Sequence, residues 1–299
     1  MAKKRIGLIG LGLMGRGIGK NLLLKGYPLT VHDIDSGAVE LLRKSGALVA
    51  SSPSGVAKNS DIIITVLPDS PDVEAVVLGA EGVLAGARPD AILIECSTID
   101  PHVTKRVGEA VRKAGCRMVD AAMGRFPKHA EEGKLLFMVG ADPKDFETVR
   151  PILEAVGTDI FYCGGPGAGI TMKMVNNLLN ISLLAADLEA MVLGVKAGLD
   201  PAVILRVLTS TMANNPHLKA TVQDEVLVGN FEPGFKAALA LKDLGLAQNM
   251  AARLGVPLFS LAPARQLYSI ALAEGKGNRS MGIIGPVLER LAGVSLTRQ

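Results

Sequence analysis

Four polar residues that could do chemistry lie close together in the second half of the chain. They are Lys173, Asn176, Asn177 and Asn180, and they follow a glycine-rich stretch, residues 164–169. Residues three and four apart share one face of a helix, so an ammonium group and several amides would point the same way. Without a ligand these groups would weaken an otherwise apolar helix. The spacing therefore predicts a binding or catalytic face.

A second glycine-rich stretch, near the N-terminus, has the pattern of a dinucleotide-binding loop. Residues 5–9 are predicted to form a buried strand, and Gly10, Gly12 and Gly15 follow it at the start of a predicted helix, residues 13–25. The first glycine permits a tight turn, the second lets a pyrophosphate approach the backbone, and the third lets the helix pack closely on the strand. The N-terminus of the helix would then face the phosphates with free N–H groups.

Asp33 is the residue predicted to select the dinucleotide. It ends the next predicted strand, residues 29–32, and lies about 20 residues after the glycines, where a carboxylate can hold the ribose 2′-hydroxyl of NAD. The same carboxylate would repel the 2′-phosphate of NADP, and no arginine follows at once to receive that phosphate. We therefore expect NAD(H) as the cofactor.

Strands and helices alternate up to about residue 164, which predicts a Rossmann-type, doubly wound parallel sheet with helices on both faces. In such sheets, ligands bind beyond the carboxyl ends of the strands. Leu67 and Pro68 end one predicted strand, and Ser97 and Thr98 follow another. Leu67, Pro68 and Thr98 are therefore candidate cofactor contacts, although a simple turn hydroxyl explains Thr98 equally well.

The composition changes after residue 164, and from there only helical periodicity is found, starting with a long helix over residues 168–197. We expect a dinucleotide-binding domain, residues 1–164, and an all-α substrate and oligomerisation domain, residues 165–299, joined by this long helix. Small residues on the helix indicate packing between subunits, so we expect a homo-oligomer, either a dimer or a tetramer. These small residues are Ala185, Ala186, Ala190 and Gly194.

The composition also limits the class of protein. A net charge of +3 without a dense basic block argues against a nucleic-acid partner. Three cysteines at wide spacing give neither a disulfide framework nor a metal pattern, and the four histidines are scattered. The long helix carries charged and amide side chains, which argues against a membrane span. We expect a cytoplasmic protein with no metal and no membrane partner.

Arg125 is the candidate for binding an anion. It follows Gly124 just past a predicted strand, in a stretch that also contains Lys128 and His129. We interpret Lys128 and His129 as residues of a solvated loop. A guanidinium group makes forked hydrogen bonds to oxyanions, so Arg125 is suited to hold the anionic end of a substrate.

Taken together, these stretches resemble the β-hydroxyacid dehydrogenase family, which includes 3-hydroxyisobutyrate dehydrogenases and tartronate semialdehyde reductases. The resemblance spans essentially the whole chain and rests on residues 10–15, 120–124, 169–177 and 242–244. It implies that Lys173 is the catalytic lysine and that Asn177 belongs to the same motif. It also implies that a further set of residues lies on the cofactor: Leu13, Met14, Asp33, Leu67, Thr98 and Lys242.

The chain departs from the usual family pattern at several positions. The family usually has Ser-Gly-Gly to receive the substrate carboxylate, whereas this chain has Gly124 and Arg125 followed by phenylalanine. The Gly-Arg pair is similar to the sulfolactaldehyde reductase branch, in which the arginine implies recognition of a sulfonate. However, Ser280 and Met281 replace an acidic–aromatic pair of the family, and Asn180 stands where that branch tends to have a small hydroxyl.

The predicted reaction is hydride transfer between nicotinamide and a carbonyl carbon. Negative charge develops on the carbonyl oxygen during reduction, and Lys173 as an ammonium can stabilise that charge and donate a proton. Asn176 or Asn177 would orient the substrate, and Arg125 would hold its anionic end. The predicted substrate contacts are Gly124, Arg125, Asn176, Asn177 and Asn180.

We therefore expect an NAD-dependent oxidoreductase that interconverts a small acidic semialdehyde and its β-hydroxy acid. The first hypothesis is the reduction of 3-sulfolactaldehyde to 2,3-dihydroxypropane-1-sulfonate. The alternatives within the family are 3-hydroxyisobutyrate dehydrogenase and tartronate semialdehyde reductase. An alternative of another class is a catalytically silent dinucleotide-binding scaffold, which the presence of Lys173 disfavours because a silent relative would be free to lose it.

Overall fold

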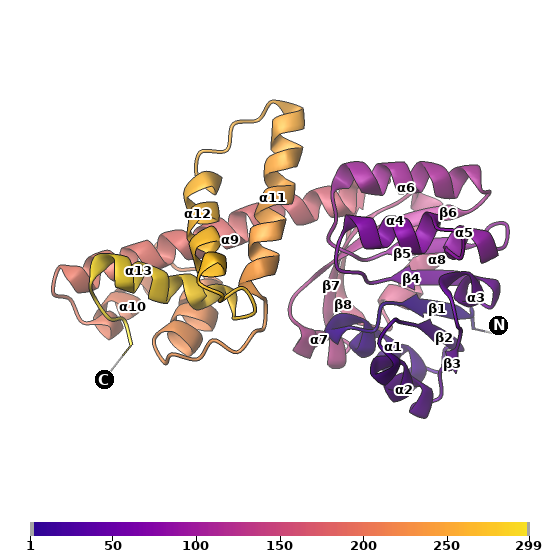
Figure 1. Cartoon of the computed structure of the whole chain (residues 1–299), viewed down its shortest axis with the longest axis horizontal. Coiled ribbons are helices and arrows are strands. Elements are labelled where there is room, and N and C mark those ends of the chain that lie inside the picture. The colour runs from indigo at the N-terminus through magenta and orange to yellow at the C-terminus, as the bar shows by residue number, and fades with distance from the viewer. Residues whose placement is uncertain (1–2, 298–299) are drawn as a thin grey trace. The chain divides into compact units, whose positions relative to one another are not determined.

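The computed structural model describes residues 3–297 and divides the chain into two compact units (Figure 1). Unit 1 comprises Met1–Lys173 and unit 2 comprises Met174–Gln299. The division falls inside one long helix, α9 (Ala168–Lys196), whereas the change in composition predicted a junction just before that helix. Each unit contains its own hydrophobic core, so each is described separately.

Unit 1 is built on one eight-stranded sheet with the order β3-β2-β1-β4-β5-β6-β7-β8. Its strands are β1 (Ile6–Ile9), β2 (Leu29–His32), β3 (Leu48–Val49), β4 (Ile62–Thr65), β5 (Ile92–Glu95), β6 (Arg117–Gly124), β7 (Leu135–Gly140) and β8 (Gly157–Gly164). This is the Rossmann-type, doubly wound arrangement that the alternation of elements predicted. Because β1 lies between β2 and β4, the strand order reverses at β1, and ligands bind beyond the strand ends at such a point.

One strand pairing differs from the parallel sheet that the sequence predicted. β6 and β7 run antiparallel, with Asp120 opposite Gly140 and Gly124 opposite Leu136. Residues 125–134 connect the two strands and contain only the five-residue helix α7 (Pro127–Glu131). A parallel crossover needs about a dozen residues or more, and usually a full helix. The shorter connection therefore turns the chain back beside β6.

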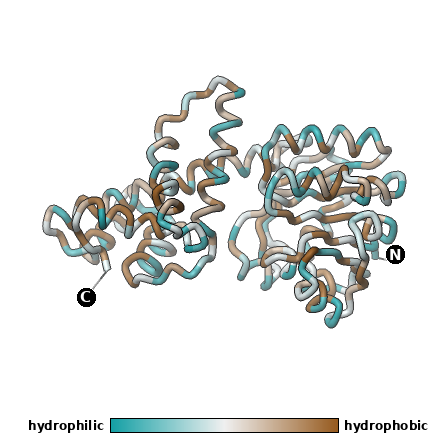
Figure 2. The backbone as a smooth tube through the Cα atoms, viewed as in Figure 1, coloured by the Kyte–Doolittle hydropathy of each residue, from teal (hydrophilic) through white to brown (hydrophobic). Residues whose placement is uncertain are grey.

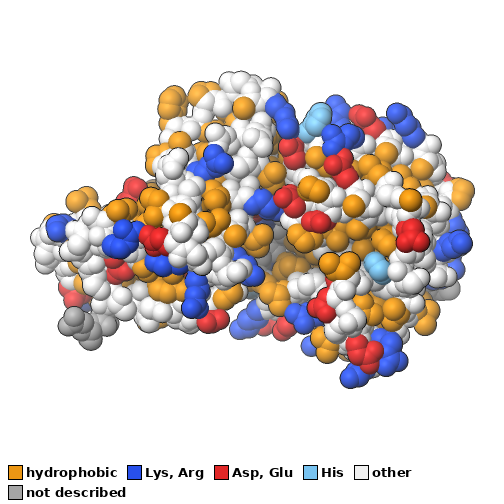
Figure 3. Space-filling model, viewed as in Figure 1, with side chains coloured by type: hydrophobic (Ala, Val, Ile, Leu, Met, Phe, Trp, Pro, Cys, Tyr) orange, Lys and Arg blue, Asp and Glu red, His pale blue; other side chains and the backbone are white. Residues whose placement is uncertain are grey.

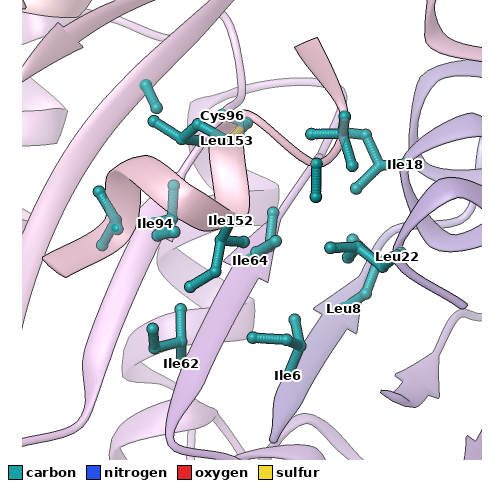
Figure 4. Close-up of a cluster of buried hydrophobic side chains, with 14 of the residues drawn as sticks. Ile6, Leu8, Ile18, Leu22, Ile62, Ile64, Ile94, Cys96, Ile152 and Leu153 are labelled. Atoms are coloured by element: carbon teal, nitrogen blue, oxygen red, sulfur yellow. The ribbon is translucent and has the colours of Figure 1, made fainter. Parts of the chain in front are cut away.

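Helices cover both faces of the sheet and bury a hydrophobic cluster on each. They are α1 (Leu13–Leu24), α2 (Ser36–Lys44), α3 (Pro53–Lys58), α4 (Ser70–Leu78), α5 (Val83–Gly86), α6 (Pro101–Lys113) and α8 (Pro143–Leu153). Figure 4 shows one cluster, in which Ile6 and Ile64 from neighbouring strands pack with Ile18 of α1 and Ile152 of α8. Side chains alternate along a strand, so Ile63 belongs to the cluster on the other face.

Unit 2 is helical, as predicted. After α9 it contains α10 (Pro201–Thr209), η1 (Leu218–Val226), α11 (Ala237–Leu254), α12 (Leu261–Ala273), η2 (Met281–Ile283) and α13 (Ile284–Ala292). Within residues 174–297 the structure has no strand, only an isolated bridge between Lys236 and Ser280. Hydrophobic residues recur along these helices (Figure 2), and Leu184 and Leu188 of α9 are fully buried among them. Asp200 caps α10 through its side chain, and a proline stands at the start of this helix.

The helix α9 buries one face and exposes another. Leu179 and Leu193 are exposed, as is Ala190. Gly194 instead packs closely against Ile204 of α10, and a Cβ atom added at Gly194 would lie only 2.6 Å from the Ile204 side chain. Ala185 is buried within the unit. Only part of the small-residue pattern that indicated subunit packing therefore faces outward.

By length and composition alone, α9 is apolar enough to cross a membrane, and it is the one such helix among the described residues. A single helix of this kind is weak evidence, because the core helix of a soluble protein passes the same test. The helix also carries Asn177, Asn180 and Asp187, each hydrogen-bonded to a residue of another segment of unit 2. Such contacts are typical of a helix inside a globular unit.

The surface carries charges of both signs. On the face shown in Figure 3, Lys and Arg side chains lie among Asp and Glu side chains. That face therefore presents no broad field of a single sign, in agreement with the small net charge of the chain.

Candidate active site

The three glycines after β1 have the local geometry that their predicted roles require. Gly10 has a φ of +92°, and a side chain there would meet the carbonyl oxygen of Val66 at 2.1 Å. A side chain at Gly15 would meet the carbonyl oxygen of Gly10 at 1.9 Å, so α1 packs directly on the turn. A side chain at Gly12, which precedes α1, would meet nothing within 4 Å. The open space at Gly12 and the N-terminus of α1 form a cradle for a pyrophosphate.

Asp33 lies beside this cradle, where the sequence predicted a ribose-binding acid. Its carboxylate accepts hydrogen bonds from the backbone N–H of Leu11 and, at 2.7 Å, from that of Asp35. These bonds fix the orientation of the carboxylate, and its remaining lone pairs can accept further donors such as a hydroxyl. On the first turn of α1, Leu13 is 54% exposed, whereas Met14 is half-buried against the core.

The loops after β4 and β5 are tied to each other by a serine that the sequence did not single out as a cofactor contact. Ser97 accepts a hydrogen bond of 2.8 Å from the backbone N–H of Leu67. Pro68 and Thr98, the neighbours of these residues, are exposed and half-buried respectively. The structure therefore brings together the strand ends at which cofactor contacts were predicted.

Glu95 is a buried carboxyl group beneath these loops. It is 2% exposed, and it accepts hydrogen bonds from the Thr65 hydroxyl at 2.5 Å and from the Ser97 backbone N–H at 2.6 Å. Burial raises the pKa of Glu95 to about 7, while the two hydrogen bonds favour the ionised form and the nearby Asp120 disfavours it. The group is thus balanced between its protonated and ionised forms near neutral pH.

Asp120 holds the beginning of α9. One of its oxygens accepts from the backbone N–H of Gly167 at 2.6 Å, and the other accepts from that of Ile170 at 2.8 Å. The strand β7 also packs against this carboxylate, since a Cβ atom added at Gly140 would lie 2.6 Å from Asp120 Oδ1. A carboxylate at a helix N-terminus satisfies free N–H groups and complements the helix dipole. Burial nevertheless raises the pKa of Asp120.

Arg125 is held by its own chain at the carboxyl end of β6. Its Nη1 donates to the carbonyl oxygen of Lys134 at 2.6 Å and to the Thr158 hydroxyl at 2.9 Å, and its Nη2 donates to Asp159 at 2.5 Å. The sequence predicted a guanidinium free to hold a substrate and did not foresee this ion pair. Arg125 also has a φ of +72°, a conformation that favours glycine.

On α9, the amides of Asn176 and Asn177 form a directed chain that begins at Asp243 of α11. Asn177 is 4% exposed and donates its Nδ2 to the Asp243 carboxylate at 2.6 Å. Its Oδ1 accepts from the Nδ2 of Asn176 at 2.9 Å. Lys242 also pairs with Asp243, at 3.5 Å. Because a carboxylate only accepts, Asp243 sets the direction of both amides, and Asn176 presents its carbonyl oxygen outward.

The predicted site residues are therefore distributed over the two units. Unit 1 holds the dinucleotide cradle, Arg125 and Lys173, whereas unit 2 holds Asn176, Asn177, Asn180 and Lys242. Sequence reasoning missed Glu95, Ser97 and the role of Asp120 as a helix cap, whose partners lie far away along the chain. His217, one of the four scattered histidines, is buried and contacts Asn180.

No group of three or more His, Cys, Asp or Glu side chains that could hold a metal ion occurs among residues 3–297. The residues at the strand ends fit a dinucleotide instead: a glycine cradle at a helix N-terminus, and a fixed carboxylate beside it. With a lysine–asparagine motif on the following helix, these features define a class, the two-domain oxidoreductases that use a nicotinamide dinucleotide.

Comparison with known proteins gives the family. Residues 5–165 match a family model described as the NAD binding domain of 6-phosphogluconate dehydrogenase. Residues 167–285 match a second family model, which is described as NAD-binding of NADP-dependent 3-hydroxyisobutyrate dehydrogenase. The chain therefore belongs to the 3-hydroxyisobutyrate dehydrogenase-like family of NAD-dependent β-hydroxyacid dehydrogenases.

Individual relatives agree with this assignment. The chain is 36% identical to a probable mitochondrial 3-hydroxyisobutyrate dehydrogenase of Dictyostelium discoideum, over 97% of this chain and 92% of that protein. It is 38% identical to a 3-sulfolactaldehyde reductase of Escherichia coli, over 93% and 94% of the two chains. A Mycobacterium tuberculosis 3-hydroxyisobutyrate dehydrogenase solved with L-serine has a similar structure, with a TM-score of 0.89, 29% identity, and coverage of 96% and 99%.

Proposed function

We propose that this enzyme uses NADH to reduce a small aldehyde that carries an anionic group, and that 3-sulfolactaldehyde is its substrate. The product would be 2,3-dihydroxypropane-1-sulfonate. Similar chains include both a 3-sulfolactaldehyde reductase and 3-hydroxyisobutyrate dehydrogenases, so the choice between these substrates rests on the site. A 3-hydroxyisobutyrate dehydrogenase or a tartronate semialdehyde reductase remains the alternative.

The observation that carries the proposal is that the Arg125 guanidinium is held by hydrogen bonds to its own chain and still has unused N–H donors. A guanidinium has five N–H donors, and three of them are used by Lys134, Thr158 and Asp159, which leaves two. Its side chain is 34% exposed. The group is thus held in place by its own chain while keeping donors for an oxyanion, as expected of a preorganised binding residue. Asp159 offsets part of its charge.

The backbone at Arg125 supports a functional reading. A left-handed conformation costs a non-glycine residue about 1 kcal/mol or more, and the resemblance to the family implies a glycine at this position. An arginine in this conformation is explained if its side chain binds a ligand. A sulfonate offers three oxygen acceptors and suits donors that point in several directions.

Lys173 and the α9 amides supply the remaining chemistry. A bound NADH provides the hydride. Lys173 as an ammonium donates a proton to the carbonyl oxygen of the substrate as the alkoxide develops. Asp120 fixes the N-terminus of the helix that carries Lys173. Retention of this lysine in a chain of an enzyme family disfavours the non-catalytic scaffold.

The test is one panel of NADH-oxidation assays. Wild-type enzyme receives sulfolactaldehyde, tartronate semialdehyde, methylmalonate semialdehyde and succinate semialdehyde, with uncharged glyceraldehyde as the reference. We expect the highest kcat/KM with sulfolactaldehyde. Arg125→Met should raise KM for sulfolactaldehyde at least tenfold more than for glyceraldehyde, because a charge-assisted hydrogen bond contributes about 1.5–3 kcal/mol.

Arg112→Met, which removes an exposed arginine of α6, is the matched control and should change neither KM. Equal losses with charged and uncharged aldehydes in Arg125→Met would show that Arg125 is structural. A preference of the wild type for methylmalonate semialdehyde would favour the 3-hydroxyisobutyrate alternative instead.

The remaining expectations about partners are proposals too. An apolar face of α9, with Leu179 at 67% and Leu193 at 72% exposed, supports a homo-oligomer in which a second copy covers that face. Light scattering of wild type and Leu193→Asp tests this, since a monomeric wild type would contradict it. A cytoplasmic location and the lack of nucleic-acid or membrane partners remain predictions from the sequence.

A further inference from the structure

His217 is a buried histidine that the reaction described above does not use. It is 8% exposed and immediately precedes η1, a nine-residue π-helix. Its Nε2 lies 3.0 Å from the backbone carbonyl oxygen of Asn180 and 2.9 Å from the side-chain Oδ1 of the same residue. Its Nδ1 lies 3.2 Å from the Thr221 hydroxyl. π-helices are rare and are frequently found at functional sites.

The backbone carbonyl of Asn180 settles which nitrogen of His217 carries the proton. A carbonyl oxygen can only accept, so the Nε2 that faces it must be the N–H donor of the neutral ring. Nδ1 is then an acceptor, and the Thr221 hydroxyl can donate to it. Burial lowers the pKa of His217, which keeps this neutral tautomer populated at physiological pH.

The same argument fixes the side-chain amide of Asn180. Since Nε2 of His217 is a donor, the Asn180 atom that faces it must be Oδ1, because the amide NH2 group would oppose it with a second donor. The Nδ2 group therefore points away from His217, and it has no hydrogen-bond acceptor within the described part of the chain. Asn180 is half-buried, so an unused amide donor lies at the surface of α9.

Asn180 lies on the face of α9 predicted for the substrate. It follows Lys173 by seven residues, about two helical turns, which returns it to nearly the same side of the helix. Asn176, between them, has its carbonyl oxygen turned outward by the Asn177–Asp243 chain. The face thus combines an ammonium, an acceptor and a donor, and each amide is oriented by a different buried residue.

The position of His217 is itself fixed by the loop before η1. Asn215 donates its Nδ2 to Asp187 of α9 at 3.0 Å, and its Oδ1 accepts from the backbone N–H of His217 at 2.9 Å. Asp187 follows Asn180 by seven residues, so the loop is bound along one side of α9 at two successive places. The imidazole is therefore held at Asn180 by contacts on both sides.

We propose that His217 is a positioning residue for substrate specificity, which holds the Asn180 amide with its NH2 group toward the substrate so that it donates to an oxygen of the anionic group. The inference rests on the proposed function, because it assumes an anionic aldehyde. A donor at Asn180 favours a sulfonate or carboxylate, whereas a flipped amide would present an acceptor and repel it.

The test compares KM for sulfolactaldehyde and for uncharged glyceraldehyde. His217→Phe removes the donor that orients Asn180 and should raise KM for sulfolactaldehyde about tenfold while changing KM for glyceraldehyde and for NADH less than twofold. His217→Gln retains an N–H donor and should restore most of the affinity. Asn180→Asp, which replaces the amide donor by a carboxylate, should raise the same KM at least as much. His102→Phe, an exposed histidine of α6, is the matched control.

Equal KM increases for both aldehydes in His217→Phe, or no increase for either, would overturn the proposal. So would a glutamine variant that remains folded by circular dichroism but is as impaired as the phenylalanine variant.

A second readout is independent of the substrate. Long-range proton–nitrogen NMR correlations of His217 in the wild type should show the proton on Nε2. A proton on Nδ1 would refute the proposed orientation of Asn180, whether or not the enzyme reduces any tested aldehyde. If instead Nε2 carries the proton and the enzyme reduces none of the aldehydes, only the proposed function is contradicted.

Discussion

Glu95→Gln should remove a pH dependence of stability that the buried carboxyl group imposes on unit 1. The Ser97 N–H can only donate to Oε1, so the proton of the neutral acid resides on Oε2, which faces the Thr65 hydroxyl. A glutamine reproduces this arrangement, with Oε1 still accepting from Ser97 and Nε2 donating to Thr65. The substitution therefore mimics protonated Glu95 without a change of shape.

The magnitude follows from the pKa of Glu95. Its value rises from an ordinary 4.5 to about 7 in the folded protein, and about 1.4 kcal/mol corresponds to each unit. Between these values the unfolded chain has lost the proton and the folded chain keeps it, so the free energy of unfolding falls as pH rises. The wild type should lose about 3 kcal/mol between pH 4.5 and 8 relative to Glu95→Gln.

The assay is urea denaturation of both proteins at several pH values, followed by far-UV circular dichroism. Groups that do not interact with Glu95 titrate alike in both proteins, so the difference between their unfolding free energies isolates this carboxyl group together with its interaction with Asp120. Glu109→Gln, which changes an exposed glutamate of α6, is the control and should follow the wild type. Parallel curves for wild type and Glu95→Gln over this pH range would refute the reasoning.

Two further predictions concern the ends of the strands. Asp120→Asn should lower the free energy of unfolding by about 1–2 kcal/mol, because it removes a charge from the N-terminus of α9; an unchanged melting temperature and kcat would contradict that role. The kcat/KM for NADH should exceed that for NADPH. Asp33→Ser should reduce this difference, because it removes the carboxylate that repels the 2′-phosphate of NADPH. A wild-type preference for NADPH would contradict the role given to Asp33.

Local features of this protein could be predicted from its sequence. The tight turn at Gly10 and the close packing at Gly15 follow from spacing within one strand–turn–helix segment, and the span of α9 follows from continuous helical periodicity over residues 168–197. The mostly parallel sheet follows from the alternation of strands and helices. In each case the information lies within about 30 residues of chain, where propensity and pattern act.

Features that depend on distant partners could not be predicted. Glu95 lies 30 residues from Thr65, and Asp120 lies 47 residues from Gly167. A local sequence pattern cannot predict pairs that lie so far apart along the chain. The same holds for His217, 37 residues from Asn180, which appeared as one of four scattered histidines. The antiparallel β6–β7 pair differs from the predicted parallel sheet for a local reason, because the connection over residues 125–134 is too short for a parallel crossover.

The most direct test of the account is the single-turnover rate of NADH oxidation by Lys173→Ala with saturating sulfolactaldehyde. If Lys173 supplies the proton to the developing alkoxide, hydride transfer should slow by about 100- to 10,000-fold, while the dissociation constant for NADH stays that of the wild type. Lys105→Ala, at an exposed position of α6, should react at the normal rate. A Lys173→Ala enzyme that turns over at the wild-type rate would contradict the assignment of α9 as the catalytic helix.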